Sequence, residues 1–525
     1  MTRRATARFC SAAEAAALIP DGATVLVDGS GGGVNEASAL LAAVEARFLA
    51  EHAPRDLTLV HVAGMGDGAG GGIDRFAHRG LVRRVIGGHW GWSPRMQAMA
   101  TREEIEAYCL PQGTLSQLLR EIAGHRPGVL THVGLGTFVD PRQAGGRLNA
   151  AAVDPIVHLV ELHGRQWIFT PSLPIDVAII RGSVADDRGN ITMDKEGLFA
   201  EALSAAQAAR NSGGIVLAQV GERTSAGSLD PRRVKVPGVL VDAIVVDPHQ
   251  RLSAATADDP YLTGQLHAGD LPTEPMPLTV RKVIARRAAR ELVAGDVVNL
   301  GFGMPDGVAA VLAEEHVSDQ VTFTVEQGHV GGVPQVGSNF GLCRNPDATL
   351  DASYQFDWYD GGGLDVAILS FAQVDLAGNV NVGKFDGRTP GVGGFINISQ
   401  GARRLVFVGT LAAGGQVSLD GNGGTTISAP GKAKFVGQVD QISFSGPEAA
   451  RSGKDVRYVT ERAVFSLTDG QLTLTELAPG LDLERDVLAH MHIRPRIHHR
   501  VRTIEPALFR AGLVGLTLAS SPERR

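Results

Sequence analysis

A segment that occurs twice in the chain is the feature that most restricts its fold. Residues 176–180 (Asp-Val-Ala-Ile-Ile) recur as residues 365–369 (Asp-Val-Ala-Ile-Leu), and the Gly-Asn-Ile of 189–191 recurs as the Gly-Asn-Val of 378–380. Both pairs are separated by 189 residues (365 − 176 and 378 − 189). Internal self-similarity of this kind indicates two related structural units rather than one continuous domain.

The beginnings of the two halves also correspond. Residues 18–25 resemble residues 292–299, and each stretch leads into a glycine-rich loop and then a helical pattern. This second offset is 274 residues (292 − 18), so the first half carries about 85 additional residues (274 − 189). Strands that alternate with helices are typical of α/β proteins. The sequence therefore predicts two related open α/β domains fused in one chain.

A polar stretch separates the two halves. It lies between the apolar strand that ends at Val246 and the helix predicted from Val283, and four prolines interrupt it: Pro260, Pro272, Pro275 and Pro277. A polar stretch interrupted by several prolines is typical of a linker. We predict an N-terminal domain over residues 1–249, a linker over 250–279 and a C-terminal domain over 280–525. A chain of 525 residues is also too long for one ordinary core.

The composition of the chain restricts which ligands it is expected to bind and in which cellular compartment it is expected to fold. A net charge of −7 gives no sign of nucleic-acid binding, so an anionic ligand would need a local basic patch. No apolar run approaches the 18 residues of a membrane span, and none is expected. Cys10, Cys109 and Cys343 are far apart and odd in number. This pattern argues against a disulfide framework and fits a reducing cytoplasm.

Several common site motifs are missing from the sequence. The glycine run at 29–33 lacks the Gly-Lys-Ser/Thr of a phosphate-binding loop and the Gly-x-Gly-x-x-Gly of a dinucleotide site. Histidines at 490, 492, 498 and 499 alternate with arginines and lack the spacing of metal ligands. No metal site is therefore expected in this tail.

One predicted strand ends directly in an acidic side chain. Residues 321–325 (Val-Thr-Phe-Thr-Val) have the pattern of a buried strand, and Glu326 follows them. Glycines at 328, 331 and 332 allow the backbone to turn sharply and a ligand to come close. Because ligands of open α/β sheets bind at the carboxyl ends of strands, Glu326 is a candidate catalytic residue. A solvated side chain that begins a loop is the alternative interpretation.

This stretch resembles the active-site segment of the family I CoA-transferases. Residues 326–334 match Glu-x-Gly-x-x-Gly-Gly-x-Pro after a buried strand, and in that family the glutamate is the covalent nucleophile. The single-chain propionate/acetate and 3-oxoacid type, in which both halves are fused, is the most similar type. The resemblance covers nearly the whole chain and implies the CoA-transferase fold, which is related to that of sugar-phosphate isomerases.

The resemblance also implies which residues contact CoA. One segment is similar to the Gly-x-Gly-x-Pro of the family and would contact CoA: Gly301, Phe302, Gly303, Met304 and Pro305. Gly391, Gly393 and Gly394 resemble the Gly-x-Gly-Gly-Phe loop. Gly391 would lie near CoA, and Gly393 with Gly394 would supply a backbone donor to an oxyanion. Lys432 and Lys434 resemble a basic strand near CoA, and which of the two meets the ligand is left open.

The acyl pocket is expected on the side of the N-terminal half. Gly136, Thr137 and Phe138 resemble the Gly-x-Gly-Thr segment that borders this pocket in the family, although a plain strand and turn is the alternative. Four apolar side chains are expected to shape a small pocket: Phe302, Met304, Phe138 and Trp90. Nothing in these residues determines which acid is bound.

The implied reaction is transfer of CoA between two short-chain carboxylic acids. It would proceed by a ping-pong mechanism through an acyl-glutamyl anhydride and a glutamyl-CoA thioester. One thioester replaces another, so neither ATP nor a metal is expected, and CoA itself is the substrate. The expected partners are an acyl-CoA, a free carboxylic acid and further copies of the chain, as a dimer or tetramer. An acyl-CoA hydrolase on the same fold and a ligand-sensing domain with an inert Glu326 are the alternatives.

Overall fold

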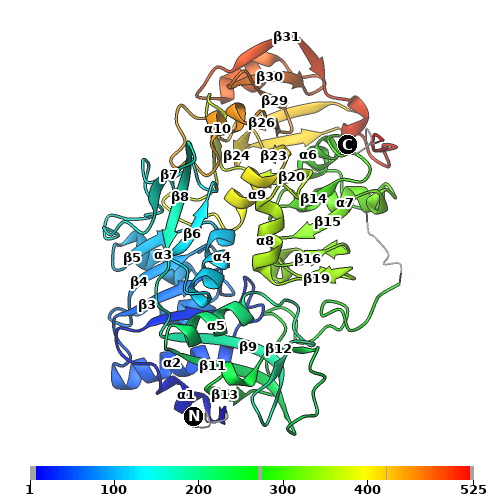
Figure 1. The fold of residues 1–525 in the computed structure, drawn as a ribbon. Helices are drawn as coiled ribbons and strands as arrows, with labels where there is room; N and C mark the ends of the chain where they lie inside the picture. Colours follow the sequence, from blue (N-terminus) through cyan, green and yellow to red (C-terminus); the bar gives the residue numbers. More distant parts are fainter. Residues whose placement is uncertain (1–6, 270–274, 421–422, 521–525) are drawn as a thin grey trace.

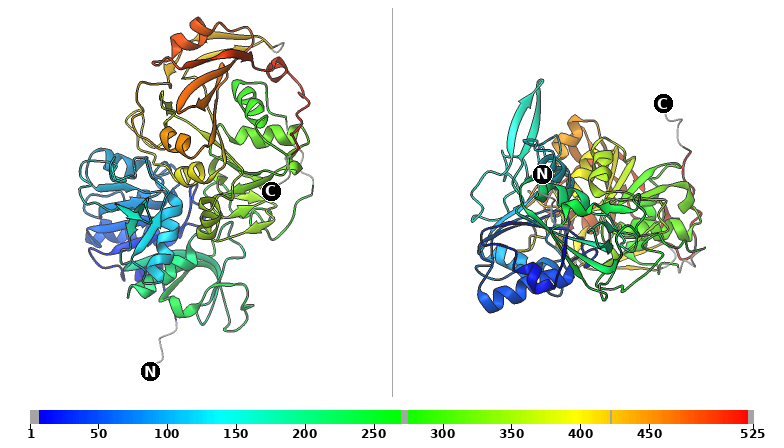
Figure 2. Two further views of the ribbon diagram at one scale, coloured as in Figure 1. Left: turned by 45° about the horizontal axis from the view of Figure 1, so that its top comes forward. Right: turned by 60° about the horizontal axis from the view of Figure 1, so that its bottom comes forward.

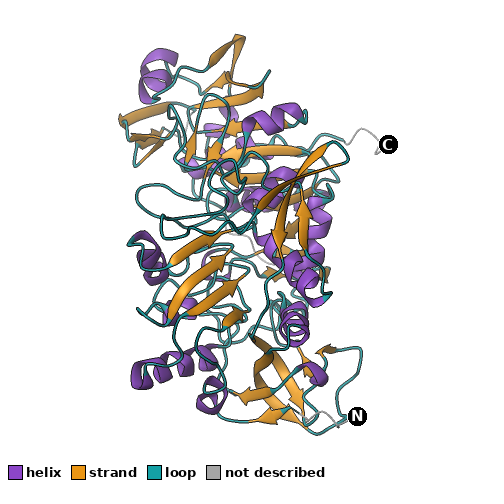
Figure 3. Ribbon diagram, turned by 60° about the vertical axis from the view of Figure 1, so that its left-hand side comes forward, coloured by secondary structure: helices purple, strands orange, loops and turns teal. Residues whose placement is uncertain are grey.

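Each half of the chain is built around a ten-stranded sheet (Figure 1). The structure is a computed structural model that describes residues 7–269, 275–420 and 423–520. Figure 2 shows the two halves from two further directions, and Figure 3 shows helices packed beside the strands in both of them. The predicted α/β class is confirmed.

The main path of the first sheet consists of parallel strands. In the order in which they neighbour one another, these strands are β1 (Arg8–Phe9), β13 (Ala243–Val246), β11 (Ile215–Thr224), β9 (Val177–Asp186), β2 (Thr24–Val27), β3 (Leu57–His61), β4 (Val82–Gly87) and β5 (Glu106–Cys109). Two short strands join it beside β9, namely β10 (Ile191–Thr192) and β12 (Val234–Val236).

The second sheet has a parallel centre with antiparallel pairs on both sides, and the last two strands on one side pair in parallel. Its strands, in neighbouring order, are β19 (Ala348–Thr349), β16 (His329–Val330), β15 (Thr322–Val325), β14 (Val297–Leu300), β20 (Val366–Ser370), β23 (Arg404–Val408), β28 (Asp455–Val459), β29 (Ala463–Thr468), β30 (Gln471–Leu477) and β31 (Arg496–Thr503).

Smaller sheets and the helices complete the fold. The smaller sheets pair β6 (Gly128–Thr131) with β8 (Arg165–Pro171) and β7 (His158–Leu162), β17 (Val333–Pro334) with β18 (Cys343–Arg344), β21 (Gln373–Val374) with β22 (Val380–Asn381), β24 (Ala412–Ala413) with β27 (Lys432–Ala433), and β25 (Gln416–Leu419) with β26 (Thr425–Ala429). The helices are α1 (Ala12–Ala16), α2 (Ser38–Glu51), α3 (Pro94–Thr101), α4 (Gln112–Ala123), α5 (Ala202–Asn211), α6 (Val280–Ala289), α7 (Asp306–Glu314), α8 (Ala352–Asp360), α9 (Phe395–Gly401) and α10 (Gly446–Arg451).

The internal repeat corresponds to equivalent strands in the two sheets. The order β11-β9-β2-β3 of the first sheet matches the order β23-β20-β14-β15 of the second. Val177 pairs with Ile215 in the first sheet, and Val366 pairs with Arg404 in the second, so the pairing preserves the offset of 189 residues (404 − 215). The prediction of two related α/β domains is confirmed at the level of strand register.

The repeated aspartate accepts an equivalent backbone hydrogen bond in both copies. The Asp176 carboxylate accepts a hydrogen bond of 2.8 Å from the Thr24 N–H at the start of β2. The Asp365 carboxylate accepts one of 2.9 Å from the Val297 N–H at the start of β14. Each aspartate thus satisfies the first donor of the neighbouring strand, which would otherwise be left unpaired as the chain enters the core.

The repeated Gly-Asn closes the same turn in both copies. Asn190 donates from its backbone and its side chain to Asp186, at 2.9 and 3.1 Å. Asn379 donates in the same way to Asp375, at 3.0 and 2.9 Å. The glycine before each asparagine has a positive φ, +83° at Gly189 and +75° at Gly378, which explains the choice of glycine.

Helices join the two halves beside the carboxyl ends of the strands. Helix α4 of the first half packs against α8 and α9 of the second (Figure 1). Asn397 on α9 accepts a hydrogen bond from the Gly113 N–H at 3.1 Å, and its amide donates to Asp360 at 3.0 Å. Gln117 on α4 donates to the same carboxylate at 2.9 Å. Polar side chains of both halves therefore share one buried network.

The predicted linker begins as a packed segment. Leu252 and Leu262 are buried in a small apolar cluster with Val34, Leu198 and Leu342, which come from both halves. Residues 270–274 lie outside the described residues. The boundaries predicted for the two domains remain a prediction, although the last strand of the first sheet ends at Val246 and the next helix, α6, begins at Val280.

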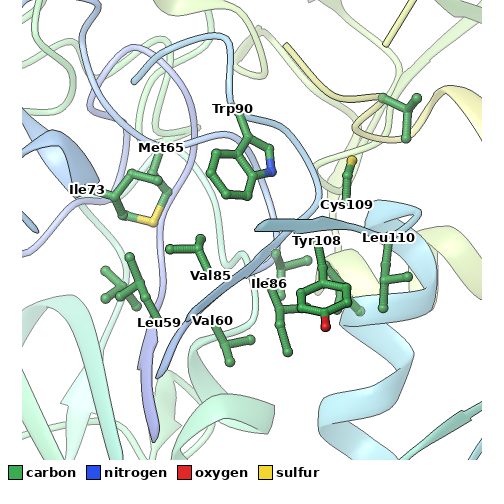
Figure 4. Close-up of a cluster of buried hydrophobic side chains, with 14 of the residues drawn as sticks. Leu59, Val60, Met65, Ile73, Val85, Ile86, Trp90, Tyr108, Cys109 and Leu110 are labelled. Atoms are coloured by element: carbon green, nitrogen blue, oxygen red, sulfur yellow. The ribbon is translucent and has the colours of Figure 1, made fainter. Parts of the chain in front are cut away.

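A continuous apolar core surrounds the central strands of the first half. Figure 4 shows part of it, where side chains of β3, β4 and β5 meet Trp90, Met65 and Ile73. Trp90 has no exposed surface. Among the helices of the described residues, none combines the length and the apolar character that crossing a membrane would need.

Replacing Asn397 by alanine is expected to weaken the junction of the two halves. The substitution leaves the Gly113 N–H without its acceptor and removes one of the two amide donors to the Asp360 carboxylate. Unsatisfied buried groups cost about 1–3 kcal/mol. A lower melting temperature in a thermal denaturation experiment would show the effect. Asn211→Ala, at an exposed asparagine whose amide donates to Ala123, should change it by much less. Equal melting temperatures for both variants would contradict the assignment.

Candidate active site

A cavity of about 480 Å³ lies where the carboxyl ends of both sheets face each other. Residues that follow β2, β3, β4 and β5 line it from the first half: Ser30, Gly31, Gly64, His89, Gly91, Trp92 and Gln112. The second half contributes Gly301, Phe302, Glu326, Gln327, Phe340, Leu369, Ser370, Val382, Phe385, residues 390–395 and Ile398. This position is the one expected for a ligand site in an open α/β protein.

Glu326 is buried at the wall of this cavity. It follows β15 directly, and only 8% of its surface is exposed, so the interpretation of a solvated loop residue is wrong. Burial of the carboxylate raises the pKa of Glu326 above its ordinary value of 4.5, and hydrogen bonds from Asn299 and Gln327 oppose this shift. Gln327 donates to the carboxylate at 3.5 Å. The result is a poorly solvated carboxylate with few protein donors.

A buried polar network fixes the strands beneath Glu326. The Tyr359 hydroxyl donates to Thr324 Oγ1 at 2.8 Å. The Asn299 amide donates to the Thr324 carbonyl at 3.3 Å and lies 3.4 Å from the Tyr359 hydroxyl. These side chains tie β14, β15 and α8 together two residues before the glutamate, so the position of Glu326 depends on rigid elements rather than on a free loop.

The glycine-rich loop of the second half is bound to the first half through its backbone. Trp90 N–H donates to the Pro390 carbonyl at 2.7 Å, and Gly393 N–H donates to the Gly88 carbonyl at 2.7 Å. Gln112 N–H donates to the Gly393 carbonyl at 2.9 Å. The loop thus pairs with the first half much as a strand pairs with its neighbour.

The two predicted oxyanion donors, Gly393 and Gly394, differ in their surroundings. The N–H of Gly393 is already engaged with Gly88. For Gly394 N–H no hydrogen bond is recorded within the described part of the chain. A Cβ atom on Gly394 would lie 3.3 Å from Cγ of Glu326, so the two residues are in direct proximity. Gly391, also predicted here, lines the cavity.

The segment predicted to contact CoA divides into two parts. Gly301 and Phe302 line the cavity. Gly303 N–H donates to the Asp306 carboxylate at 3.1 Å, so an internal anion already occupies this turn. Met304 packs against the core of the second half, and Pro305 precedes α7. The contact of these last three residues with CoA stays a prediction.

The two candidate lysines lie outside the lining of the cavity. Lys432 is exposed and forms an ion pair with Asp386. Lys434 is half-buried, with its Nζ 4.1 Å from the centre of the Phe371 ring, and desolvation lowers the pKa of its ammonium to about 8. Their role toward CoA remains a prediction.

The residues predicted to border the acyl pocket lie outside this cavity, and their role toward the acyl group stays a prediction. Gly136, Thr137 and Phe138 do not line the cavity. Phe138 N–H donates to the Ile442 carbonyl at 2.8 Å, and a Cβ on Gly136 would meet Ser445 and Glu448, so this segment docks onto the second half instead. Trp90 packs into an apolar core (Figure 4) and is likewise outside the lining. Met304 is also outside it and packs against the core of the second half. Only Phe302 of the predicted apolar set borders the cavity.

Several lining residues were missed in the sequence. Ser30, His89, Trp92 and Gln112 all follow the carboxyl ends of strands in the first sheet, and Phe340 comes from the loop after β17. The strand-end rule would have identified the first four if it had been applied to every strand and not only to β15. Within the described ranges, no group of three or more His, Cys, Asp or Glu is arranged to hold a metal ion.

The chain is similar to known CoA-transferases over nearly its whole length. The family model described as coenzyme A transferase matches residues 9–247. The chain is 42% identical to the acetate CoA-transferase YdiF of Escherichia coli O157:H7, covering 97% of this chain and 96% of YdiF. It is 43% identical to a caffeate CoA-transferase of Acetobacterium woodii, covering 96% and 97%. The crystal structure of YdiF as a thioester complex with CoA superposes with a TM-score of 0.93 at 40% identity, covering 98% of each chain.

Replacing Glu326 by glutamine is expected to stabilise the folded protein at neutral pH. The raised pKa means that ionisation of Glu326 costs folding free energy. This cost is present above the pKa of the folded state and disappears as the pH falls toward the ordinary value of 4.5. The melting temperature of Glu326→Gln should therefore exceed that of the wild type at pH 7, and the difference should shrink in more acidic buffer. Glu51→Gln, at an exposed glutamate, is the control. A less stable Glu326→Gln protein at pH 7 would contradict this account.

Proposed function

The chain belongs to the coenzyme A transferase family, and from this premise we propose that Glu326 is the nucleophile with which it transfers CoA between carboxylic acids. The observation that carries the proposal is the placement of Glu326. It is a desolvated carboxylate at a strand end, in a cavity that both halves line. The relative YdiF, which has been crystallised as a thioester complex with CoA, supports a covalent route.

The proposed reaction uses the carboxylate twice. An oxygen of Glu326 attacks the carbonyl carbon of the acyl-CoA, the C–S bond breaks, and CoA leaves as a thiolate. The products of this step are an acyl-glutamyl anhydride and the thiolate. The thiolate then attacks the glutamyl carbonyl carbon, which forms the glutamyl-CoA thioester and releases the first acid as a carboxylate. A second carboxylate reverses both steps, and the kinetics are therefore ping-pong.

Desolvation assists the attack of Glu326. A carboxylate in water is a weak nucleophile because its hydrogen bonds to water must break first. Burial away from water raises the pKa of Glu326, and the few hydrogen bonds that it accepts from the protein oppose this shift only in part. Its carboxylate remains ionised at pH values above the raised pKa, so we expect activity to fall on the acidic side.

Each tetrahedral species carries an oxyanion, and Gly394 is suited to stabilise it. Gly394 lies beside Glu326, and no hydrogen bond donated by its N–H is found among the described residues. One preorganised donor of this kind typically contributes about 3 kcal/mol to the transition state. Since thioester exchange is nearly thermoneutral, we propose that no cofactor beyond the substrate CoA takes part.

The acyl specificity is open within this proposal. The relatives of highest coverage are named for acetate and for caffeate, which differ greatly in size. We propose short-chain acids as substrates, and a panel that includes both acids would test this. We also propose a homo-oligomer and a reducing compartment such as the cytoplasm, which sedimentation analysis and localisation of the tagged protein would test.

Incubation with an acyl-CoA in the absence of an acceptor acid should leave CoA attached to Glu326. The thioester persists because no second carboxylate is present to accept the CoA. Mass spectrometry of the peptide that contains residues 325–327 would detect the adduct, and borohydride should reduce it. Glu326→Gln should lose at least about 10³-fold in kcat because an amide does not attack. Glu326→Asp, shorter by one methylene, should lose about 100-fold.

Two outcomes would contradict this assignment. Freshly prepared Glu326→Gln that transfers CoA at the wild-type rate would place the nucleophile elsewhere. Rapid release of free CoA without any acceptor acid would indicate the alternative function of an acyl-CoA hydrolase.

Gly394→Ala should impair turnover without unfolding the protein. The new methyl group would lie 3.2 Å from Ile398, 3.3 Å from Glu326 and 3.3 Å from Phe356, so the nucleophile must move by a few tenths of an ångström. Small displacements of reacting groups reduce rates strongly, and we expect a loss of about 10- to 100-fold in kcat. Gly437→Ala is the matched control, since no atom lies within 4 Å of its Cβ position. Unchanged kcat for Gly394→Ala would contradict the close approach of residue 394 to the nucleophile.

A further inference from the structure

His89 borders the catalytic cavity from the first half, and two glycines make room for its ring. A Cβ on Gly64 would lie 2.5 Å from Nδ1 of His89, and a Cβ on Gly91 would lie 2.5 Å from Cε1. Contacts this short are sterically forbidden, so any other residue at either position would displace the imidazole. The ring therefore has one well-defined place in the wall of the cavity.

The hydrogen-bond pattern of the ring makes Nε2 a donor. Gly91 N–H donates to Nδ1 of His89 at 3.2 Å, so Nδ1 carries no hydrogen. Desolvation, together with the nearby His61, lowers the pKa of His89 to about 4. The imidazole is then neutral at pH 7, and its one ring hydrogen is on Nε2. In the part of the chain that the structure describes, no hydrogen bond is recorded for this Nε2.

His89 and Glu326 both lie beside one short loop of the second half. His89 forms an isolated backbone bridge with Gly391. A Cβ on Gly393 would lie 3.7 Å from Cβ of His89, and a Cβ on the next residue, Gly394, would lie 3.3 Å from Cγ of Glu326. His89 and Glu326 thus flank the same loop and line the same cavity.

We propose that the Nε2–H of His89 binds the carboxylate of the acceptor acid and orients it toward the thioester on Glu326. The proposal rests on the role proposed for Glu326 and identifies the residue of the first half that recognises the acid. One carboxylate oxygen accepts the hydrogen bond from Nε2, and the other attacks the glutamyl carbonyl. No bond to His89 forms or breaks, and no proton moves.

A neutral donor suits this task better than a cation. The attacking oxygen must keep its negative charge, and a full positive charge beside it would weaken its nucleophilicity. A neutral N–H orients the acid at a smaller cost to that charge. The same donor can hold the carbonyl oxygen of an incoming acyl-CoA, which occupies the equivalent place in the first half-reaction.

Two substitutions of His89 distinguish binding of the acid from packing. His89→Leu fills the site with an apolar side chain and removes the donor. His89→Gln places an amide N–H at a similar distance along the side chain. We expect His89→Leu to raise the steady-state KM for the acid by about 10- to 100-fold, with a smaller change in kcat. His89→Gln should recover most of that loss. His158→Leu, at an exposed histidine of β7, is the matched control and should resemble the wild type.

The discharge of the covalent intermediate gives a second readout. His89→Leu should still form the CoA adduct on Glu326 at a high acyl-CoA concentration, but added acid should discharge the adduct about 10- to 100-fold more slowly at subsaturating concentrations. A wild-type KM for the acid in His89→Leu would overturn the proposal. Equal losses in His89→Leu and His89→Gln would also overturn it, because they would indicate packing alone.

Failure of this inference and failure of the proposed nucleophile are separable. The steady-state KM for the acid is measurable without detecting any intermediate, so a KM that does not depend on His89 counts against His89 alone. Absence of the CoA adduct in the wild type counts against Glu326 alone.

Discussion

Backbone hydrogen bonds between residues 88–90 of the first half and residues 390–393 of the second are the interaction on which the site depends. They engage the N–H of Gly393 with Gly88 and hold the loop against the strand ends of the first sheet. The same loop then presents Gly394 beside Glu326. The nucleophile and the donor proposed for its oxyanion both belong to the second half, yet the first half sets the distance between them. Neither half alone contains a complete site.

The site combines groups whose burial is unfavourable with a support that keeps them in place. Glu326 is desolvated, and His89 remains neutral for the same reason. Ionisation of Glu326 costs folding free energy at neutral pH, and such costs are common where a protein prepares reactive groups in advance. The network of Tyr359, Thr324 and Asn299 under the glutamate ties the neighbouring strands and α8 together by hydrogen bonds. The reactive carboxylate of Glu326 and the hydrogen bonds that hold its strand in place therefore lie next to each other along β15.

Features that depend on local sequence patterns could be predicted from the sequence. Features that depend on how the two halves pack against each other could not. The repeat and Glu326 were predictable because strand patterning and turn glycines are local signals. The place of residues 136–138 was not, because their backbone hydrogen bond to Ile442 forms only when the halves associate. Trp90 and Trp92 are two residues apart at one strand end, and the sequence does not reveal that Trp92 borders the cavity while Trp90 packs into the core. The hydrogen bond from Gly393 N–H to Gly88, which joins the two halves, could likewise not be predicted from the sequence.

A crystal structure of this protein soaked with an acyl-CoA, without an acceptor acid, tests the central claim most directly. The account predicts continuous density from Glu326 to the sulfur of CoA, with the glutamyl carbonyl oxygen within hydrogen-bond distance of Gly394 N–H. The bonds of Gly393 to Gly88 and of Trp90 to Pro390 should persist in that state. A thioester whose oxygen lies away from Gly394, or a loop that has left the first half while the thioester is present, would contradict the account.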